Sequence, residues 1–304
     1  MFTNGRLSFV ENMALTQAMP NDLNVVNRHT HERILRMSTP MDDAVDKDVA
    51  VQPLDAKGVT VESSCQYSRD VADRWDELID WEKRAEGEGS FFVDRLREVG
   101  ARRVIDVCAG SGFHAVQLRK AGFDVLACDG SPYMVERAKM NFKSHDVAIP
   151  IKQIEWLNLD SRLLGTYDAV VCLGSSLCHV FDQSTRSQVL KRFRDLLRPG
   201  GLLIVDQRNY HAIRAGRFKS TGQYYYCGVT AHIGLGEVSD ELCEFIYTFS
   251  DMTSFKLRVY PILPAQMCAE IEREDFAVTR SFGDFKPIYD ALGSHFIIHT
   301  ALAQ

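Results

Sequence analysis

The sequence predicts an α/β protein with a mostly parallel, seven-stranded sheet and a small antiparallel insert. The first sign is a strand, a glycine loop and a helix over residues 102–121, the usual opening of a nucleotide-binding βαβ unit. The second is the alternation of apolar strand-like runs with helical periods that continues as far as Asp206. The third is a stretch at about 222–262 that contains short strand-like runs and no helical period.

The chain begins with a segment unlike the rest. Residues 1–60 mix polar residues with no sustained period, so we expect a disordered or loosely ordered extension, followed by one domain over 61–304. Apolar residues at helical spacing predict a helix over 71–83. The same spacing predicts a second helix over 91–99, which ends at Gly100.

The first strand and its glycine loop come next. Residues 102–108 form an apolar run rich in β-branched side chains, as a buried strand does. Gly110 and Gly112 allow a tight turn and a close approach of the backbone to a ligand. Helical spacing continues to Ala121, and Gly122 stands where a C-terminal cap is expected.

Further βα units follow, as in a parallel sheet covered by helices on both faces. We expect strands over 124–128, 151–155, 167–173 and 202–205, a helix that starts at the N-cap Ser131 with Pro132, and a helix over 185–197. Arg198 to Gly201 should break that helix, and Asp206 should close the strand after it. In the insert we expect strands at 224–227, 242–249 and 255–262, then a helix over 265–272 and final strands near 276–282 and 295–302.

Composition excludes several classes of function. A net charge of −6 argues against nucleic acid or an anionic membrane as the main partner. No apolar run approaches the ~20 residues of a membrane span. The 8 cysteines contain no C-x-x-C pair and the 9 histidines no metal-binding pair, so we expect reduced cysteines, no metal and a cytoplasmic protein. Organellar targeting by the extension and the oligomeric state stay open.

The glycine loop fits two cofactors. Gly110-x-Gly112-x-x-Ala115 matches the dinucleotide fingerprint, with Asp129 at about the expected offset. The same residues match the D-x-x-x-G-x-G loop of S-adenosylmethionine (SAM) methyltransferases, with Asp106 leading. A dehydrogenase would need a second mononucleotide half and an acid–base pair for hydride transfer, and neither is evident.

The residues after the later strands favour SAM. Asp129 at a strand end is placed to accept both ribose hydroxyls, and Glu155-Trp156-Leu157 supplies an apolar slot beside a polar residue for adenine. Backbone carbonyls near Ala109 and Leu173 suit the ammonium of the methionine tail, and Arg84 suits its carboxylate.

Longer runs resemble the glycine N-methyltransferases, particularly the microbial glycine/sarcosine N-methyltransferases that start betaine synthesis. The runs are Leu78-Ile-Asp-Trp81 with Arg84-Ala, Gly110-Ser-Gly-Phe-His114, Asp129-Gly-Ser131, Cys172-Leu-Gly-Ser-Ser-Leu-Cys-His179, Asp206-Gln-Arg-Asn-Tyr210, Tyr224-Tyr-Tyr-Cys-Gly228 and Gly283-Asp-Phe-Lys286. The resemblance covers Tyr67 to the C-terminus. It implies a Rossmann-like class I SAM-dependent methyltransferase fold and methyl transfer to glycine and sarcosine, for betaine-type osmolyte synthesis or SAM homeostasis. Another small amine as substrate, or a non-catalytic SAM-binding regulator, stays open.

The residues and the resemblance together predict a site. The cofactor set is Tyr67, Trp75, Arg84, Asp106, Ala109, Gly110, Gly112, Asp129, Gly130, Ser131, Met134, Glu155, Trp156, Leu157, Leu173 and His179. The substrate set is Ser175, Arg208, Asn209, Tyr210, Tyr226, Tyr247 and Tyr260. The catalytic set is Gly174, Arg208, Tyr210 and Tyr226.

The roles within the amino-acid site follow from side-chain chemistry. The planar fork of Arg208, at the carboxyl end of the fifth strand, matches a carboxylate in two parallel hydrogen bonds. The carbonyl of Gly174 is expected to select the neutral amine, and the insert tyrosines to cover the site and attract cationic groups. Ser175 departs from the resemblance, because the family usually has Asn there, and this leaves the choice of amine open.

Overall fold

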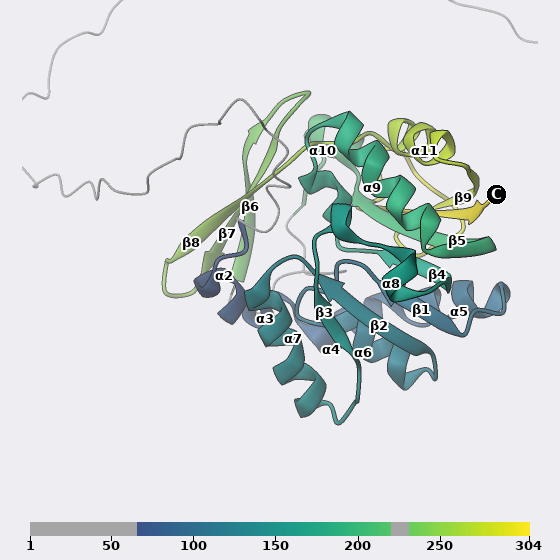
Figure 1. The fold of residues 1–304 in the computed structure, drawn as a ribbon. Helices are drawn as coiled ribbons and strands as arrows, with labels where there is room; N and C mark the ends of the chain where they lie inside the picture. The colour runs from purple at the N-terminus through teal and green to yellow at the C-terminus, as the bar shows by residue number, and fades with distance from the viewer. Residues whose placement is uncertain (1–65, 220–230) are drawn as a thin grey trace, which may run out of the picture. The chain divides into compact units, whose positions relative to one another are not determined.

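A computed structural model describes residues 66–219 and 231–304, which form two β-sheets and the helices packed on them (Figure 1). The predicted extension over 1–60 and the predicted strand at 224–227 lie outside the described residues. Within the described ranges, no helix is both long enough and apolar enough to cross a bilayer.

The larger sheet confirms the predicted architecture. Its strands are β1 (Arg103–Asp106), β2 (Asp124–Asp129), β3 (Ile151–Gln153), β4 (Tyr167–Cys172), β5 (Leu197–Arg208), β9 (Phe276–Gly283) and β10 (Phe296–Ala303). Their order is β3-β2-β1-β4-β5-β10-β9. The first five are parallel, and β10 runs antiparallel to both β5 and β9. The carboxyl ends of β1, β2 and β4 therefore meet at one edge, where parallel sheets bind ligands.

Helices lie on both faces of this sheet and beside the insert. They are α2 (Arg69–Asp73), α3 (Trp75–Leu78), α4 (Trp81–Glu88), α5 (Phe91–Glu98), α6 (Phe113–Lys120), α7 (Pro132–Ser144), α8 (Ser161–Leu164), α9 (Gln183–Asp195), α10 (Tyr210–Arg214) and α11 (Pro264–Arg273), with 3₁₀ turns η1 (Trp156–Asn158) and η2 (Ser176–His179). Phe193 of α9 packs in the same core as Ile105, whereas Phe92 of α5 packs with the adjacent Val104 on the other face. This alternation along β1 is what a strand buried on both faces requires.

Two element predictions were wrong. The single helix over 71–83 is three short helices, because Arg74 leaves helical geometry (φ −100°, ψ 1°) and Asp80 starts α4 by accepting from the Lys83 N–H at 3.0 Å. The segment Arg198 to Gly201, predicted as a break, belongs to β5, which pairs with β4 from Leu197 onward. Asp206 consequently lies inside the strand and does not close it.

The insert is a separate antiparallel sheet of β6 (Ala231–Val238), β7 (Cys243–Phe249) and β8 (Ser254–Val259), in that order. Strands β7 and β8 confirm two of the predicted runs, and β8 ends before the predicted 262. The sequence did not predict β6, because Gly234 and Gly236 weaken its strand pattern. The chain leaves the insert at Tyr260, whose N–H donates to the Cys178 carbonyl of η2 at 2.7 Å.

Candidate functional site

A pocket of about 840 Å³ lies at the carboxyl ends of β1, β2 and β4. It is lined by Tyr67, Trp75, Ile79, Arg84, Val107, Cys108, Ala109, Gly110, Ser111, Phe113, His114, Asp129, Gly130, Ser131, Met134, Ile154, Glu155, Trp156, Leu173, Gly174, Ser176 and His179. That volume includes space open to solvent, and the mixed apolar and polar lining suits a small-molecule cofactor. The described residues contain no cluster of three or more His, Cys, Asp or Glu that would hold a metal ion.

All but three of the predicted cofactor residues line this pocket, the exceptions being Asp106, Gly112 and Leu157. Asp106 lies beneath the glycine loop, where its Oδ1 accepts from the Cys108 N–H at 3.2 Å and burial raises its pKa to about 6. Gly112 caps α6 at φ 94°, and a Cβ there would lie 2.5 Å from the ring of Phe142. Leu157 packs on the core. Asp106 and Gly112 thus act on the shape of the loop.

Asp129 holds the glycine loop and the start of α7 together. Its Oδ2 accepts from the Gly110 N–H at 2.8 Å, and its Oδ1 accepts from the Ser131 N–H at 2.9 Å. Burial raises the pKa of Asp129 to about 6, although the two N–H groups favour the charged form. Each oxygen has a second lone pair that can accept another hydrogen bond, so the carboxylate fits a pair of ribose hydroxyls.

Trp156 forms an apolar wall of the pocket beside Ile154 and Glu155. Its Nε1 donates to the Val107 carbonyl at 2.7 Å, and its ring meets the ring of Phe193 edge to face at 5.9 Å. The indole is therefore held by the core on one side and forms part of the pocket on the other, which suits a flat heterocycle such as adenine.

Arg84 is buried in the pocket wall as part of an ionic cluster. Its Nε donates to Glu88 Oε1 at 2.7 Å, and its guanidinium lies over the Phe113 ring at 4.6 Å. His114 Nε2 lies 3.1 Å from Glu88 Oε2 and 3.2 Å from an Arg84 terminal nitrogen. Burial raises the pKa of Glu88, but the charges of His114 and Arg84 outweigh this effect and the net pKa is lowered.

Sequence reasoning missed Glu88 and His114. Glu88 stands four residues after Arg84 on α4, a spacing at which opposite charges pair on a helix. His114 ends the Gly110-Ser-Gly-Phe-His114 run and follows the helix cap by two residues. The spacing of Glu88 from Arg84 could have predicted their ion pair. The contact of His114 with Glu88 joins α6 to α4 and could not be read from local sequence.

Tyr67, Trp75 and His179 form a third wall. The Tyr67 hydroxyl is hydrogen-bonded to His179 Nε2 at 3.1 Å, and burial lowers the pKa of His179 to about 4. The rings of Tyr67 and Trp75 meet edge to face at 5.3 Å. Trp75 also lies 6.4 Å from Tyr247 of β7, which stacks on Phe255 of β8 at 4.8 Å. An aromatic cluster thus connects the pocket with the insert.

The loop after β4 has unusual backbone geometry. Gly174, which lines the pocket, has φ 81°, and Ser175 has φ 60° and ψ 26° in the left-handed region. The Ser175 N–H donates to Asp206 Oδ1 at 2.7 Å, and burial raises the pKa of Asp206. The hydroxyl of Ser175 is buried with no hydrogen-bond partner among the described residues. Asn is the side chain that adopts this conformation more readily.

The predicted substrate residues that the structure describes do not line this pocket, and Tyr226 lies outside the described residues. Arg208 is buried at the end of β5 with its guanidinium 4.6 Å from the Phe245 ring. Tyr210 is fully buried, and burial raises the pKa of its hydroxyl well above its usual value. Asn209 caps α10 and donates to the carbonyls of Ala291 and Ser294, so its amide holds the loop before β10. Tyr247 lies in β7, the central strand of the insert, and Tyr260 directly follows β8.

Comparison with known proteins agrees with this geometry. A family model described as a methyltransferase domain matches residues 104–201. A crystal structure of an S-adenosylmethionine-dependent methyltransferase from Clostridium acetobutylicum superposes with a TM-score of 0.62 at 15% identity, covering 77% of this chain and 98% of that one, and supports the fold.

Curated relatives are closer in sequence. The glycine/sarcosine N-methyltransferase of Halorhodospira halochloris is 37% identical over 236 residues, which are 78% of this chain and 88% of the relative. The enzyme of the same name from Aphanothece halophytica is 35% identical over 259 residues, 84% of this chain and 98% of the relative. The cofactor-shaped pocket, the fold and this similarity lead to one conclusion: the chain belongs to the glycine/sarcosine N-methyltransferase family.

Proposed function

We propose that this protein transfers the methyl group of SAM to the amine nitrogen of glycine and of sarcosine. The proposal depends on one observation: a single pocket at the carboxyl edge of the sheet is lined by Asp129, Trp156 and Arg84, whose side chains suit a ribose, an adenine and a carboxylate. The names of the relatives, glycine/sarcosine N-methyltransferases, support the choice of amine.

The residues present fit SAM. Asp129 would accept from the ribose hydroxyls, Trp156 with Ile154 would enclose the adenine, and Arg84 would pair with the carboxylate of the methionine tail. SAM would supply an electrophilic methyl group on its sulfonium: the lone pair of an unprotonated amine would form a bond to the methyl carbon while the C–S bond breaks and a neutral thioether leaves. The protein's contribution is to hold the reactants in line, an effect worth roughly 7–11 kcal/mol in well-oriented systems.

Arg208 would hold the carboxylate of the amino acid through two parallel hydrogen bonds. Its burial among aromatic rings restricts the guanidinium to few orientations, which favours a fixed substrate pose. Gly174 lines the pocket at a left-handed turn, and its carbonyl would accept from the neutral amine. Tyr210 and the insert tyrosines, including Tyr226, would complete the substrate site.

The proposal extends to the domain organisation, partners and cellular location of the enzyme. Residues 61–304 would form the catalytic domain and 1–60 an extension outside it. The net charge of −6 favours a small amino acid as partner over nucleic acid or a membrane surface. We place the enzyme in the cytoplasm, in betaine-type osmolyte synthesis or in control of SAM levels.

A product assay tests the proposal. The protein is incubated with SAM and, separately, with glycine, sarcosine, dimethylglycine and β-alanine, and the products are identified by mass. We expect N-methylated glycine and sarcosine. Methylation of β-alanine in preference to both would identify a different small amine as the substrate, an alternative that Ser175 leaves open. SAM binding without any methylated product would identify a regulator and refute the enzymatic function.

A further inference from the structure

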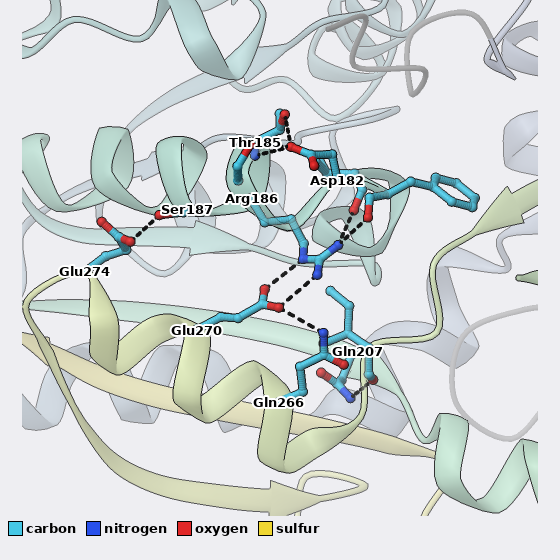
Figure 2. Close-up of polar contacts among 12 residues, drawn as sticks. Asp182, Thr185, Arg186, Ser187, Gln207, Gln266, Glu270 and Glu274 are labelled. Atoms are coloured by element: carbon cyan, nitrogen blue, oxygen red, sulfur yellow. Dashed lines mark hydrogen bonds and ion pairs between the residues drawn. The ribbon is translucent and has the colours of Figure 1, made fainter. Parts of the chain in front are cut away.

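A fully buried ion pair lies outside the pocket, between α9 and α11 (Figure 2). The side chains of Arg186 and Glu270 are 1% and 2% exposed. Arg186 donates to the two oxygens of Glu270 in parallel at 2.7 and 2.8 Å, and Gln266 donates to the same carboxylate at 2.9 Å. The charge of each partner is therefore compensated, as burial requires.

Arg186 makes a second set of contacts on its other side. Its remaining terminal nitrogen donates to the carbonyls of Val180 and Phe181, both at 2.8 Å. Its guanidinium also lies 4.5 Å from the centre of the Tyr260 ring. Val180 and Phe181 directly follow η2, and Tyr260 is the first residue after β8. One guanidinium thus contacts both the loop after β4 and the return of the insert.

Both of these segments lead to the cofactor pocket. His179, next to Val180, is hydrogen-bonded to the Tyr67 hydroxyl, and both residues line the pocket. Gln66 fastens the same region to β8, because its side chain accepts from the Arg258 N–H at 2.7 Å and donates to the Arg258 carbonyl at 3.1 Å. The pocket wall is therefore connected through η2 and β8 to the contacts of Arg186.

Stability alone does not account for this arrangement. Replacing a buried ion pair by apolar side chains of similar volume is often neutral or stabilising. An apolar pair, however, has no donors for two consecutive carbonyls and no cation for the Tyr260 ring. Unlike an apolar residue, Arg186 makes contacts that fix the positions of Val180, Phe181 and Tyr260.

We infer that Arg186, held by Glu270, is a positioning residue for the cofactor pocket: it sets where η2, and with it His179, lies against Tyr67 and the insert. The inference rests on the proposed function only in taking the pocket as the SAM site. Glu270 orients Arg186 and compensates its charge. The hydrogen bonds described above for its carboxylate come from Arg186 and Gln266, and the loop after β4 is contacted by Arg186.

The two roles of the pair can be separated by variants. Glu270→Gln weakens the ion pair but leaves Arg186 its carbonyl partners, so we expect a lower Tm and an affinity for S-adenosylhomocysteine near that of the wild type. The double variant Arg186→Met with Glu270→Leu removes both buried charges but leaves the Val180 and Phe181 carbonyls without their donor, so we expect a Tm at or above that of Glu270→Gln. Its affinity should nevertheless fall by roughly 3- to 30-fold, the range for residues that act on a site through a packed network.

The measurement is calorimetric titration of each purified full-length variant with S-adenosylhomocysteine, together with thermal unfolding. Arg194→Met is the control, because Arg194 also lies on α9 and donates to a carbonyl, that of Asp275, but is only half-buried and makes this hydrogen bond in an exposed position. Affinities that follow Tm across the variants, or a double variant with wild-type affinity, would refute the inference. If the double variant does not fold, Arg186→Lys, which cannot span Glu270 and both carbonyls, replaces it with the same expected loss. Because no amine is present, the test remains valid if the amine proposed above is wrong.

Discussion

Arg208→Lys is the most direct test of how the amino acid is held. Arg208 is 8% exposed at the end of β5, and its guanidinium lies 4.6 Å from the Phe245 ring of β7 and 5.1 Å from the Phe296 ring of β10. Its side chain leaves the strand on the same face as Asp206, which binds the Ser175 N–H, because side chains two residues apart in a strand share a face. Asp206, on the same face of the strand, therefore links β5 to the loop that carries Gly174.

The magnitude follows from the hydrogen bonds that lysine cannot make. Lysine keeps the positive charge but presents no second, parallel N–H to a carboxylate. The loss of one hydrogen bond to a charged group costs about 1.5–3 kcal/mol. We therefore expect kcat/KM for glycine to fall by about 10- to 150-fold.

Steady-state kinetics with glycine, together with calorimetric titration of S-adenosylhomocysteine, measure this effect. The cofactor affinity should stay unchanged, because Arg208 does not line the cofactor pocket. Arg280→Lys is a matched control, since Arg280 also lies over an aromatic ring, that of Phe282 at 4.9 Å, but on the outer strand β9. A kcat/KM for glycine within about twofold of the wild type would show that another group binds the carboxylate.

Three further predictions concern the cofactor pocket and the substrate loop. Burial raises the pKa of Asp129 to about 6, and the ribose hydroxyls need its ionised form, so the affinity for S-adenosylhomocysteine should fall by up to about tenfold per pH unit below 6. Calorimetric titration of the wild type at several pH values measures this fall. Asp129→Asn should bind S-adenosylhomocysteine weakly, with an affinity that depends less on pH. Glu88→Gln leaves Arg84 buried without its counter-charge and should cost about 3–5 kcal/mol of unfolding free energy at pH 7 in urea titrations. Folding lowers the pKa of Glu88, so the loss of unfolding free energy in the variant should be complete above pH 4.5, the ordinary pKa of a glutamate, and should shrink as the pH falls through the lowered pKa of the folded state. A loss that does not depend on pH would contradict the charge pairing. Ser175→Asn should change the ratio of kcat/KM for sarcosine to that for glycine by about tenfold or more, and an unchanged ratio would show that this side chain does not contact the amine.

Most of the fold was predicted from local sequence patterns. The glycine loop and the strands around it are readable because glycine conformation and β-branched runs act over a few residues. Prediction failed where the tertiary context decided: β6 contains Gly234 and Gly236 yet pairs along β7, and Arg198 to Gly201 form part of a strand because β4 supplies the partner. The three helices between 69 and 88 differ from one helix only by the turns at Arg74 and Asp80.

The site was predicted less completely than the fold. Asp129, Trp156 and Arg84, each of which stands at a recognisable point of the βα pattern or of a family run, line the pocket as expected. The ionisation of Asp129 and the charge partner of Arg84 were not predicted. The burial that raises the pKa of Asp129 and the placing of the Glu88 carboxylate beside Arg84 both result from packing.

What the sequence by itself determined is the order of strands and helices, the glycine loop and the chemistry at the strand ends, because these depend on neighbours in the chain. Only the tertiary structure decided that His114 meets Glu88, that Asp206 binds the loop of Ser175, and that Arg186 joins η2 to Tyr260 across more than 70 residues of chain. These contacts join segments far apart in the sequence. Their partners are selected by shape and by the need to satisfy buried charges, and no local pattern records either.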